Sequence, residues 1–165
     1  EGNSNNKYYI REQKELEENM SLFQSFNINT SALTAQRFRM DVISENVANV
    51  TTTRTEDGTP YTRKIVTFRE KEVTPFSKVL SNTQEAFLGN GVKVSRVSED
   101  RDSEYIMKYD PSHPDADENG YVSYPNVNII TEMTNMIDAS RSYEANLTAF
   151  ETSKAIAMKG LELGK

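Results

Sequence analysis

Apolar residues repeat at a helical spacing over the first third of the chain. One set recurs every seven residues and a companion set follows it: Phe26, Leu33, Met40 and Val47, then Leu22, Asn29, Gln36, Ile43 and Val50. From Leu33 onward the two sets alternate at spacings of three and four residues, interrupted only by Gln36, as in the narrow apolar stripe of a coiled coil. Thr30 and Ser31 are typical N-cap residues. The pattern predicts a helix over about 31–50, about 30 Å long, with residues 20–29 leading into it.

A second apolar stripe with the same spacing runs to the end of the chain. Its positions are Ile129, Met133, Met136, Ser140, Tyr143, Leu147, Phe150, Lys154, Ala157 and Leu161. Pro125 and Asn126 mark its entry, and Gly160 and Gly164 weaken its exit. The stripe predicts a helix over about 128–162, about 50 Å long.

The segment between the two stripes has the pattern of β-structure. Residues 91–97 alternate with a period of two, and residues 63–68, 104–109 and 121–124 are further strand candidates. Asp57, Gly58 and Pro60 indicate a turn before the first strand. Residues 74–90 are predicted to form a loop with a short helical turn.

These patterns predict an α+β fold in which long N- and C-terminal helices pack as a coiled coil and a small β-rich domain is inserted between them. We divide the chain into a tag or extension outside the core (1–19), an N-terminal helical arm (20–50), a β-rich insert (51–124) and a C-terminal helix that pairs with the arm (125–165). Residues 1–6 have a loop-like composition; a weakly helical natural arm is the alternative for 1–19.

The two predicted helices differ in length, which leaves part of the longer stripe without an intramolecular partner. Phe150, Ala157 and Leu161 would then face water in a monomer, which is unfavourable by about 25 cal/mol per Å² of apolar surface. We therefore expect another chain to bury this surface. The alternative is that residues 20–29 or the insert cover it.

Composition narrows the class of protein. The 165 residues are 36% hydrophobic, and adding the 7 glycines still leaves the chain below the usual 45–50% or so, so the core should be small. A net charge of −6 argues against nucleic acid as a partner. The absence of cysteine and the single histidine exclude thiolate sites and multi-histidine metal sites within one chain. No stretch is apolar enough to span a membrane, and residues 1–19 contain no secretory signal.

Few residues suggest chemistry. Residues 115–120, Asp-Ala-Asp-Glu-Asn-Gly, match the first half of a calcium-binding loop, but Asn126 stands where the bidentate Glu should be. A turn in which these side chains bond their own backbone explains the composition without an ion. Glu132, Glu144 and Glu151 are predicted to lie on a solvated helix face. No acid–base pair, activated nucleophile or phosphate loop is apparent, so we expect no enzyme activity and no cofactor or metal.

Two segments resemble a known family. Residues 43–52, Ile-Ser-Glu-Asn-Val-Ala-Asn-Val-Thr-Thr, are similar to the N-terminal signature of the rod and hook family of bacterial flagellar axial proteins. A second match narrows the resemblance to the C type of proximal-rod protein. It consists of residues 120–128, Gly-Tyr-Val-Ser-Tyr-Pro-Asn-Val-Asn, residues 139–146, Ala-Ser-Arg-Ser-Tyr-Glu-Ala-Asn, and the 113–117 loop. The resemblance covers about residues 20–165.

The resemblance implies a structural subunit of the proximal rod of the flagellar basal body, outside the cytoplasmic membrane and periplasmic in a two-membrane cell. It implies export through the flagellar type III apparatus and assembly, through the terminal helices, with copies of the chain and other rod proteins into a shaft that transmits torque. From the net charge and the lack of a long apolar stretch we expect no nucleic acid partner and no direct membrane insertion. A generic coiled-coil adaptor or a calcium-binding module would account for parts of the sequence.

We predict assembly-interface residues on both helices. The packing candidates are Leu33, Met40, Ile43, Val47, Met133, Met136, Tyr143, Leu147 and Phe150, and the polar candidates are Asn46, Asn49, Arg141 and Asn146. For Asn46 and Asn49, which lie close to the end of the predicted helix, capping of the last turn is the alternative.

Overall fold

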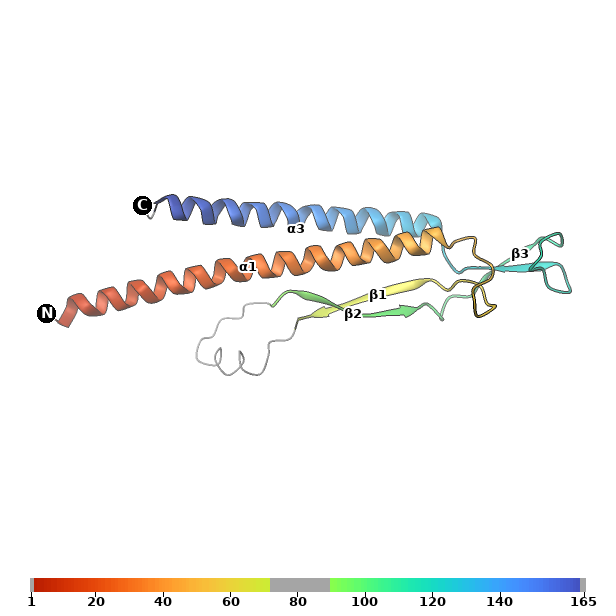
Figure 1. Cartoon of the computed structure of the whole chain (residues 1–165), viewed down its shortest axis with the longest axis horizontal. Coiled ribbons are helices and arrows are strands. Elements are labelled where there is room, and N and C mark those ends of the chain that lie inside the picture. The colour runs from red at the N-terminus through yellow and green to blue at the C-terminus, as the bar shows by residue number, and fades with distance from the viewer. Residues whose placement is uncertain (1, 72–89, 164–165) are drawn as a thin grey trace. The chain divides into compact units, whose positions relative to one another are not determined.

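The computed structural model describes the backbone of residues 2–71 and 90–163 and the side chains of residues 24–71 and 90–162. The elements, in chain order, are α1 (Gly2–Ala48), β1 (Lys64–Glu70), β2 (Val92–Glu99), β3 (Ile106–Tyr109), β4 (Tyr121–Tyr124) and α3 (Ile129–Leu163) (Figure 1). They form two compact units: unit 1 contains residues 1–34, 70–93 and 144–165, and unit 2 contains residues 35–69 and 94–143.

The prediction of an α+β chain with two long helices flanking short strands is confirmed. The β4 bounds agree with the prediction, whereas β1, β2 and β3 each begin one or two residues later than expected and β1 and β2 also end two residues later. The predicted loop at 74–90 falls almost entirely outside the described residues.

The predicted N-terminal helix is much too short. We expected it over about 31–50, and a loop-like composition over 1–6, but α1 starts at Gly2 and has 47 residues. Glu, Gln, Lys and Leu are frequent over 12–18 and are good helix formers, and a helix that has already nucleated extends at little cost. The expected length difference is therefore wrong in direction, because α3 has only 35 residues.

Unit 1 joins its part of α1 to the start of β2 through one serine. The Ser31 hydroxyl donates to the Ile28 carbonyl at 2.7 Å and accepts from the Val92 N–H at 3.0 Å. Gly91 precedes this contact with a positive φ of 84°, and a Cβ at this position would overlap Ser31 Oγ. Glycine is therefore required at this position both by its backbone conformation and by the close approach of α1.

In the same unit an aromatic pair joins the two helices. The rings of Phe26 and Phe150 meet edge to face with centroids 5.1 Å apart. Phe150, which we expected to face water in a monomer, is thus half-buried, whereas Leu161 is 71% exposed, as expected.

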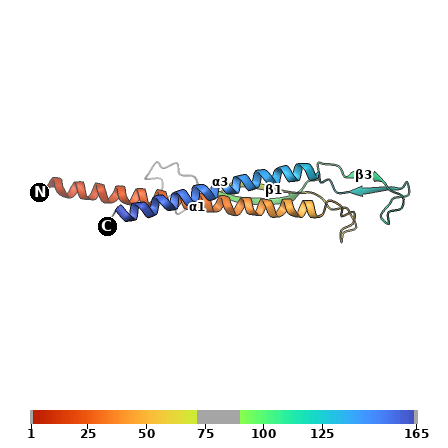
Figure 2. The same ribbon diagram turned by 90° about the horizontal axis from the view of Figure 1, so that it is seen from above.

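Unit 2 contains the end of α1, the start of α3, most of β1 and β2, and the whole of β3 and β4. Within it the two helices lie side by side and run antiparallel (Figures 1 and 2). β1 and β2 form one two-stranded sheet, and just beyond it the Asp100 N–H donates to the Arg63 carbonyl at 2.7 Å. β3 and β4 form the other, antiparallel, with Ile106 opposite Tyr124 and Tyr109 opposite Tyr121.

The core of unit 2 is small, as the composition predicts. Its buried apolar side chains are Ala35, Val42, Ile43, Tyr61, Val122, Val127 and Ala139. They come from both helices, from β4 and from the connecting segments, and the fully buried Pro125 lies between Val122 and Val127 in the sequence. A core of this size leaves much of the apolar surface of the helices uncovered.

The buried faces of the helices are rotated from the predicted stripes. On α1 the predicted Ile43 is buried, but so are Ala35, Val42 and Asn46, while the predicted Leu33, Met40 and Val47 are only half-buried. On α3, Glu132 and Ala139 are buried, and the predicted Ile129 and Met133 are exposed. The rotation arises because α1 packs against β1 as well as α3, which a two-helix pattern does not anticipate.

Candidate functional site: a buried polar cluster

The end of α1 carries a buried asparagine whose amide is fully used. Asn46 is 1% exposed. Its Nδ2 donates to the Lys64 carbonyl and to Glu132 Oε2, both at 2.9 Å. Its Oδ1 accepts from the Tyr61 hydroxyl at 2.9 Å and from the Lys64 N–H at 2.8 Å. A side-chain amide has two donor hydrogens and two acceptor positions, so Asn46 is saturated within the chain.

The partner of Asn46 on α3 is a buried carboxylate held by an arginine. Glu132 is 1% exposed, and its Oε1 accepts from Arg63 Nε at 2.9 Å and from Arg63 Nη2 at 2.7 Å. Asn135 Nδ2 adds a long contact at 3.4 Å. A buried charge is tolerated only when it is paired and hydrogen-bonded. The prediction that Glu132 lies on a solvated face is therefore wrong, while Glu144 and Glu151 are exposed as expected.

Arg63 also extends this polar cluster, defined as Asn46, Tyr61, Arg63, Lys64 and Glu132, toward the segment before α3. Its N–H donates to Asn126 Oδ1 at 2.8 Å, and Asn126 Nδ2 donates to the Asp100 carbonyl at 2.7 Å. The Arg63 guanidinium also lies 3.5 Å from the Asp100 carboxylate. The cluster thus connects four segments of unit 2: the end of α1, the start of β1, the end of β2 and the start of α3.

Two groups at the cluster have shifted pKa values. Burial, reinforced by the Glu45 and Glu132 carboxylates, raises the pKa of Tyr61 to about 12. Burial alone would raise the pKa of Asp100, but hydrogen bonds from Ser103 and the charge of Arg63 outweigh it and hold that pKa below its usual value. Neither shift produces a group that exchanges a proton near neutral pH. Tyr61, Arg63 and Lys64 are each bonded to another side chain of unit 2, so the cluster connects elements of the fold.

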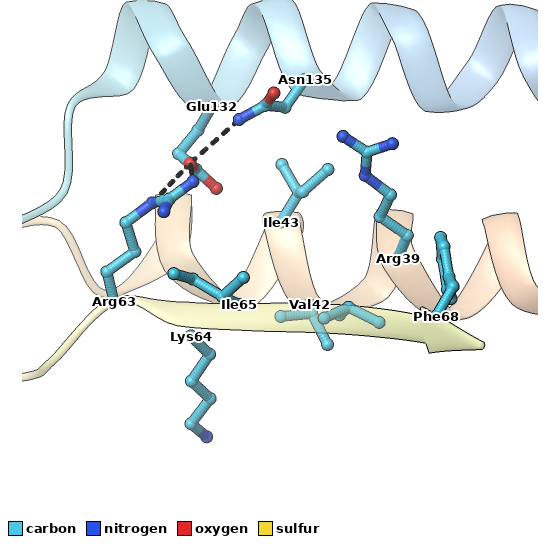
Figure 3. A pocket seen from close by; sticks show the side chains of 10 residues that line it. Arg39, Val42, Ile43, Arg63, Lys64, Ile65, Phe68, Glu132 and Asn135 are labelled. Carbon is cyan, nitrogen blue, oxygen red and sulfur yellow. Dashed lines mark hydrogen bonds and ion pairs between the residues drawn. The ribbon is translucent and has the colours of Figure 1, made fainter. Parts of the chain in front are cut away.

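A cleft lies beside the cluster. It has a volume of about 310 Å³ and lies between α1, β1 and α3. Its lining residues are Arg39, Val42 and Ile43 of α1, Arg63 before β1, Lys64, Ile65, Val66 and Phe68 of β1, and Glu132 and Asn135 of α3. Figure 3 shows Arg63 reaching Glu132 at one side and the Arg39 guanidinium projecting between the helices on the other. Val42, Ile43, Ile65 and Phe68 contribute apolar side chains to its lining.

The acidic loop at 113–120 forms the turn that its composition predicts. Asp117 Oδ1 accepts from the N–H groups of Asn119 at 2.9 Å and Tyr121 at 2.7 Å. The Asp115 carboxylate accepts from the Thr53 hydroxyl at 2.9 Å. Among the described residues no group of three or more potential ligands is placed to hold a metal ion.

The predicted interface residues fall into three groups by exposure. Ile43 and Asn46 are buried; Leu33, Met40, Val47, Asn49, Met136, Tyr143, Asn146 and Phe150 are half-buried; Met133, Arg141 and Leu147 are exposed. Asn49 performs the capping that we kept as its alternative role. Its Nδ2 donates to the Glu45 carbonyl at 2.9 Å, and its Oδ1 accepts from the Thr52 hydroxyl.

Sequence reasoning missed the cluster as a unit. It selected Asn46 but not Tyr61, Arg63 or Glu132, because their partners lie 15 to 86 residues away in sequence. An Asn–Glu pair of that separation leaves no periodic signal. The one available hint was that Glu132 lies in the first turn of a helix, where a carboxylate is favourable.

Two family models match the segments that the cluster brings together. The model described as "Flagella basal body rod protein" matches residues 26–54, which include Asn46. The model described as "Flagellar basal body rod FlgEFG protein C-terminal" matches residues 118–163, which include Glu132. The Asn46–Glu132 hydrogen bond therefore joins the two matched segments directly.

Whole-chain comparison gives the same family. The chain is 47% identical over 152 residues to the flagellar basal-body rod protein FlgC of Bacillus subtilis, which covers 88% of this chain and all of the relative. It is 44% identical to FlgC of Borreliella burgdorferi, with 87% and 98% covered, and 39% identical to FlgC of Salmonella typhimurium, with 88% and 100% covered. The chain belongs to the FlgC family of flagellar basal-body rod proteins.

Membership of the FlgC family confirms the resemblance inferred from residues 43–52, 120–128 and 139–146 and the 113–117 loop. The chain is a structural subunit of the flagellar rod, not an enzyme, and its place is the basal body, where it assembles with other rod proteins. Neither helix, over its described residues, has a segment both apolar and long enough to cross a membrane.

Proposed function

We propose that the chain builds the proximal rod by packing its two terminal helices, α1 and α3, as a coiled coil with the helices of neighbouring subunits. The observation that carries the proposal is the exposure of large apolar side chains along α3. Ile130 is 77% exposed, Ile156 62% and Leu161 71%. Burial of such side chains is worth about 25 cal/mol per Å², so a subunit that leaves them in water is stabilised by assembly.

The small core fits a chain that is exported before it assembles. A subunit that passes through the flagellar type III apparatus must unfold, and a marginal core lowers the free energy that unfolding requires. The entropy cost of ordering the helices is then offset by the contacts that they make in the rod. The assembled rod transmits torque. We place the assembled chain outside the cytoplasmic membrane, periplasmic in a two-membrane cell, with no direct membrane insertion. The division into arm (20–50), insert (51–124) and C-terminal helix (125–165), with 1–19 outside the core, stays part of the proposal.

The proposed interface retains the residues selected from the sequence, with roles adjusted to their exposure. Met133, Arg141 and Leu147 are exposed and can contact a neighbour directly, and the half-buried positions can do so at the edges of the helix pair. Ile43 and Asn46 are buried, so they act by fixing the helices that present the interface. Asn49 keeps a proposed polar contact in addition to its cap.

The test replaces one exposed apolar residue of α3 by aspartate. Ile137 is 53% exposed, so Ile137→Asp should leave the circular dichroism of the purified chain unchanged but prevent rod assembly and swimming. Thr131→Asp is the matched control, because it places the same charge at another exposed position of α3. Normal rods with Ile137→Asp would contradict the proposal. If Asn49→Ala gave normal rods and normal swimming, only the proposed polar contact of Asn49 with a neighbouring subunit would be contradicted.

A further inference from the structure

The cleft of unit 2 presents an arginine that is unpaired within the described part of the chain. Arg39 borders the cleft, and among the described residues it makes no hydrogen bond and no ion pair. In Figure 3 its guanidinium points into the space between α1 and α3, and no dashed line joins it to the other residues drawn. The Arg39 residue is half-buried, so part of its hydration is already lost without compensation.

The other cations that line the cleft are already paired. Arg63 forms two hydrogen bonds with Glu132, and Lys64 forms an ion pair with Glu45. Arg39 is therefore the position at which the cleft attracts an anion. Because Val42, Ile65 and Phe68 contribute apolar surface beside it, the complementary ligand combines an apolar side chain with a carboxylate.

The chain itself carries a surface of that chemistry. Ile130, Met133 and Ile137 recur at helical spacing on the outer face of α3 in unit 2, and they are 77%, 56% and 53% exposed. Asp138 follows directly; it is exposed, and across residues 24–71 and 90–162 it has no hydrogen-bond or ion-pair partner. This outer face is thus an apolar stripe flanked by an available carboxylate.

We propose that the cleft of one copy receives the outer α3 face of a second copy, with Asp138 of the second copy pairing with Arg39. The proposal rests on the proposed function, because it names one contact by which subunits assemble. The two surfaces are different parts of the chain, so each copy can offer its cleft to one neighbour and its α3 face to another. Such a heterologous contact generates an open helical assembly rather than a closed dimer.

Charge complementarity favours this pairing over a random association of copies. Each copy carries a net charge of −6, so copies repel one another in general. A local Arg–Asp pair at the edge of an apolar contact offsets that repulsion in one register only, and a pair of this kind contributes more to specificity than to affinity.

A charge exchange tests the pairing in flagellated cells whose only copy of the chain is the variant. Arg39→Glu and Asp138→Arg should each impair rod assembly and swimming, and the double variant should restore both. Arg37→Glu is the matched control, because Arg37 is an exposed arginine of α1 that does not line the cleft, and rods should form normally. Circular dichroism of each purified variant checks that it folds. Failure of the double variant to restore assembly, although all variants fold, would overturn the pairing.

Disulfide trapping identifies the partner, and the chain has no cysteine of its own. Arg39→Cys and Asp138→Cys are placed on two separately tagged copies in the same cell, so that a bond can form only between copies. Oxidised basal bodies should contain a dimer that carries both tags, and a pair with Asp41→Cys in place of Arg39→Cys should give none.

Absence of the mixed dimer in cells that do build rods would overturn the contact while leaving the proposed function standing. If Ile137→Asp prevented rod assembly but Arg39→Glu and Asp138→Arg each gave normal rods, the contact would likewise be overturned and the proposed function would stand. A photoreactive residue at position 39 that links only to a different rod protein would overturn the identity of the occupant. Normal rods with Ile137→Asp would instead contradict the proposed function itself.

Discussion

A buried carboxylate stabilises a fold only while its partners remain. Glu132 loses its hydration in the folded chain and recovers the lost free energy through Arg63 and Asn46. The Arg63 side chain is 23% exposed, so it can bring its charge to Glu132 while keeping contact with water. The polar cluster therefore favours one geometry of α1, β1 and α3, because a shift of any of the three leaves a buried donor or acceptor unpaired.

Removal of Arg63 should be far more harmful than removal of the whole ion pair. Arg63→Ala leaves the Glu132 charge buried, and we expect a loss of about 3–5 kcal/mol in the free energy of unfolding. Arg63→Met with Glu132→Leu replaces the ion pair by apolar groups and should recover part of that loss, limited by the Asn46 N–H that loses its Glu132 acceptor. Urea unfolding followed by circular dichroism measures both. Equal losses in the single and double variants would show that the charge is not the cause.

Tyr61 should make the fold sensitive to alkali. Its pKa is about 12 in the folded chain, whereas an unfolded tyrosine titrates near 10. Because the folded value is the higher one, the contribution of Tyr61 to stability is complete below about pH 10 and is lost as the pH rises toward 12.

Tyr61→Phe tests this dependence. The variant should be less stable at neutral pH by about 0.5–1.5 kcal/mol, because the hydrogen bond to Asn46 is lost. Its stability should then fall less steeply than that of the parent chain between about pH 10 and 12, as measured by urea unfolding at several pH values. Parallel curves throughout this range would contradict the assigned shift, whereas parallel curves below about pH 9 are the internal control.

At the scale of elements, the spacing of apolar residues predicted those features of the helices and strands that the local sequence determines. The type of every described helix and strand was predicted, and the β4 bounds were right, because period-two and helical spacings are local properties. The start of α1 was missed although residues 12–18 favour a helix locally, and the inner faces of both helices were missed because they depend on contacts distant in sequence. Val42 of α1 faces the interior because it lies against β1, and Glu132 of α3 faces the interior because its hydrogen-bond partners Arg63 and Asn46 lie opposite it.

The contact between α1 and β2 in unit 1 depends on Gly91. Its φ of +84° and the close approach of Ser31 Oγ leave no room for a methyl group. Gly91→Ala should therefore lower the free energy of unfolding by at least about 1 kcal/mol, through backbone strain and displacement of Ser31. Gly58→Ala is the informative comparison, because Gly58 also has a positive φ but no heavy atom lies within 4 Å of the place that its methyl group would take.

Thermal unfolding of the two variants separates strain from steric overlap. If the Ser31 contact matters, Gly91→Ala is the less stable of the two, and the added substitution Ser31→Ala relieves part of its defect. Equal stability of Gly91→Ala and Gly58→Ala would mean that only the backbone conformation is at stake.

The whole molecule divides its apolar surface between a small core and exposed helix faces. Unit 2 buries seven apolar side chains together with Asn46 and Glu132, whereas the end of α3 in unit 1 leaves Ile156, Met158 and Leu161 more than half exposed. The free energy that orders a segment comes from the apolar contacts it makes, so these parts should differ in local stability. The free chain should open first where its apolar side chains have no cover.

Amide hydrogen exchange on the free chain and on purified basal bodies measures this difference. In the free chain we expect slow exchange around Asn46 and Glu132 and fast exchange over residues 154–163. In basal bodies the same α3 segment should exchange slowly, because neighbouring subunits bury its apolar face and raise the free energy of local opening. Slow exchange over residues 154–163 in the free monomer would mean that α3 needs no neighbour, and the exposed stripe would lose its role in holding the rod together.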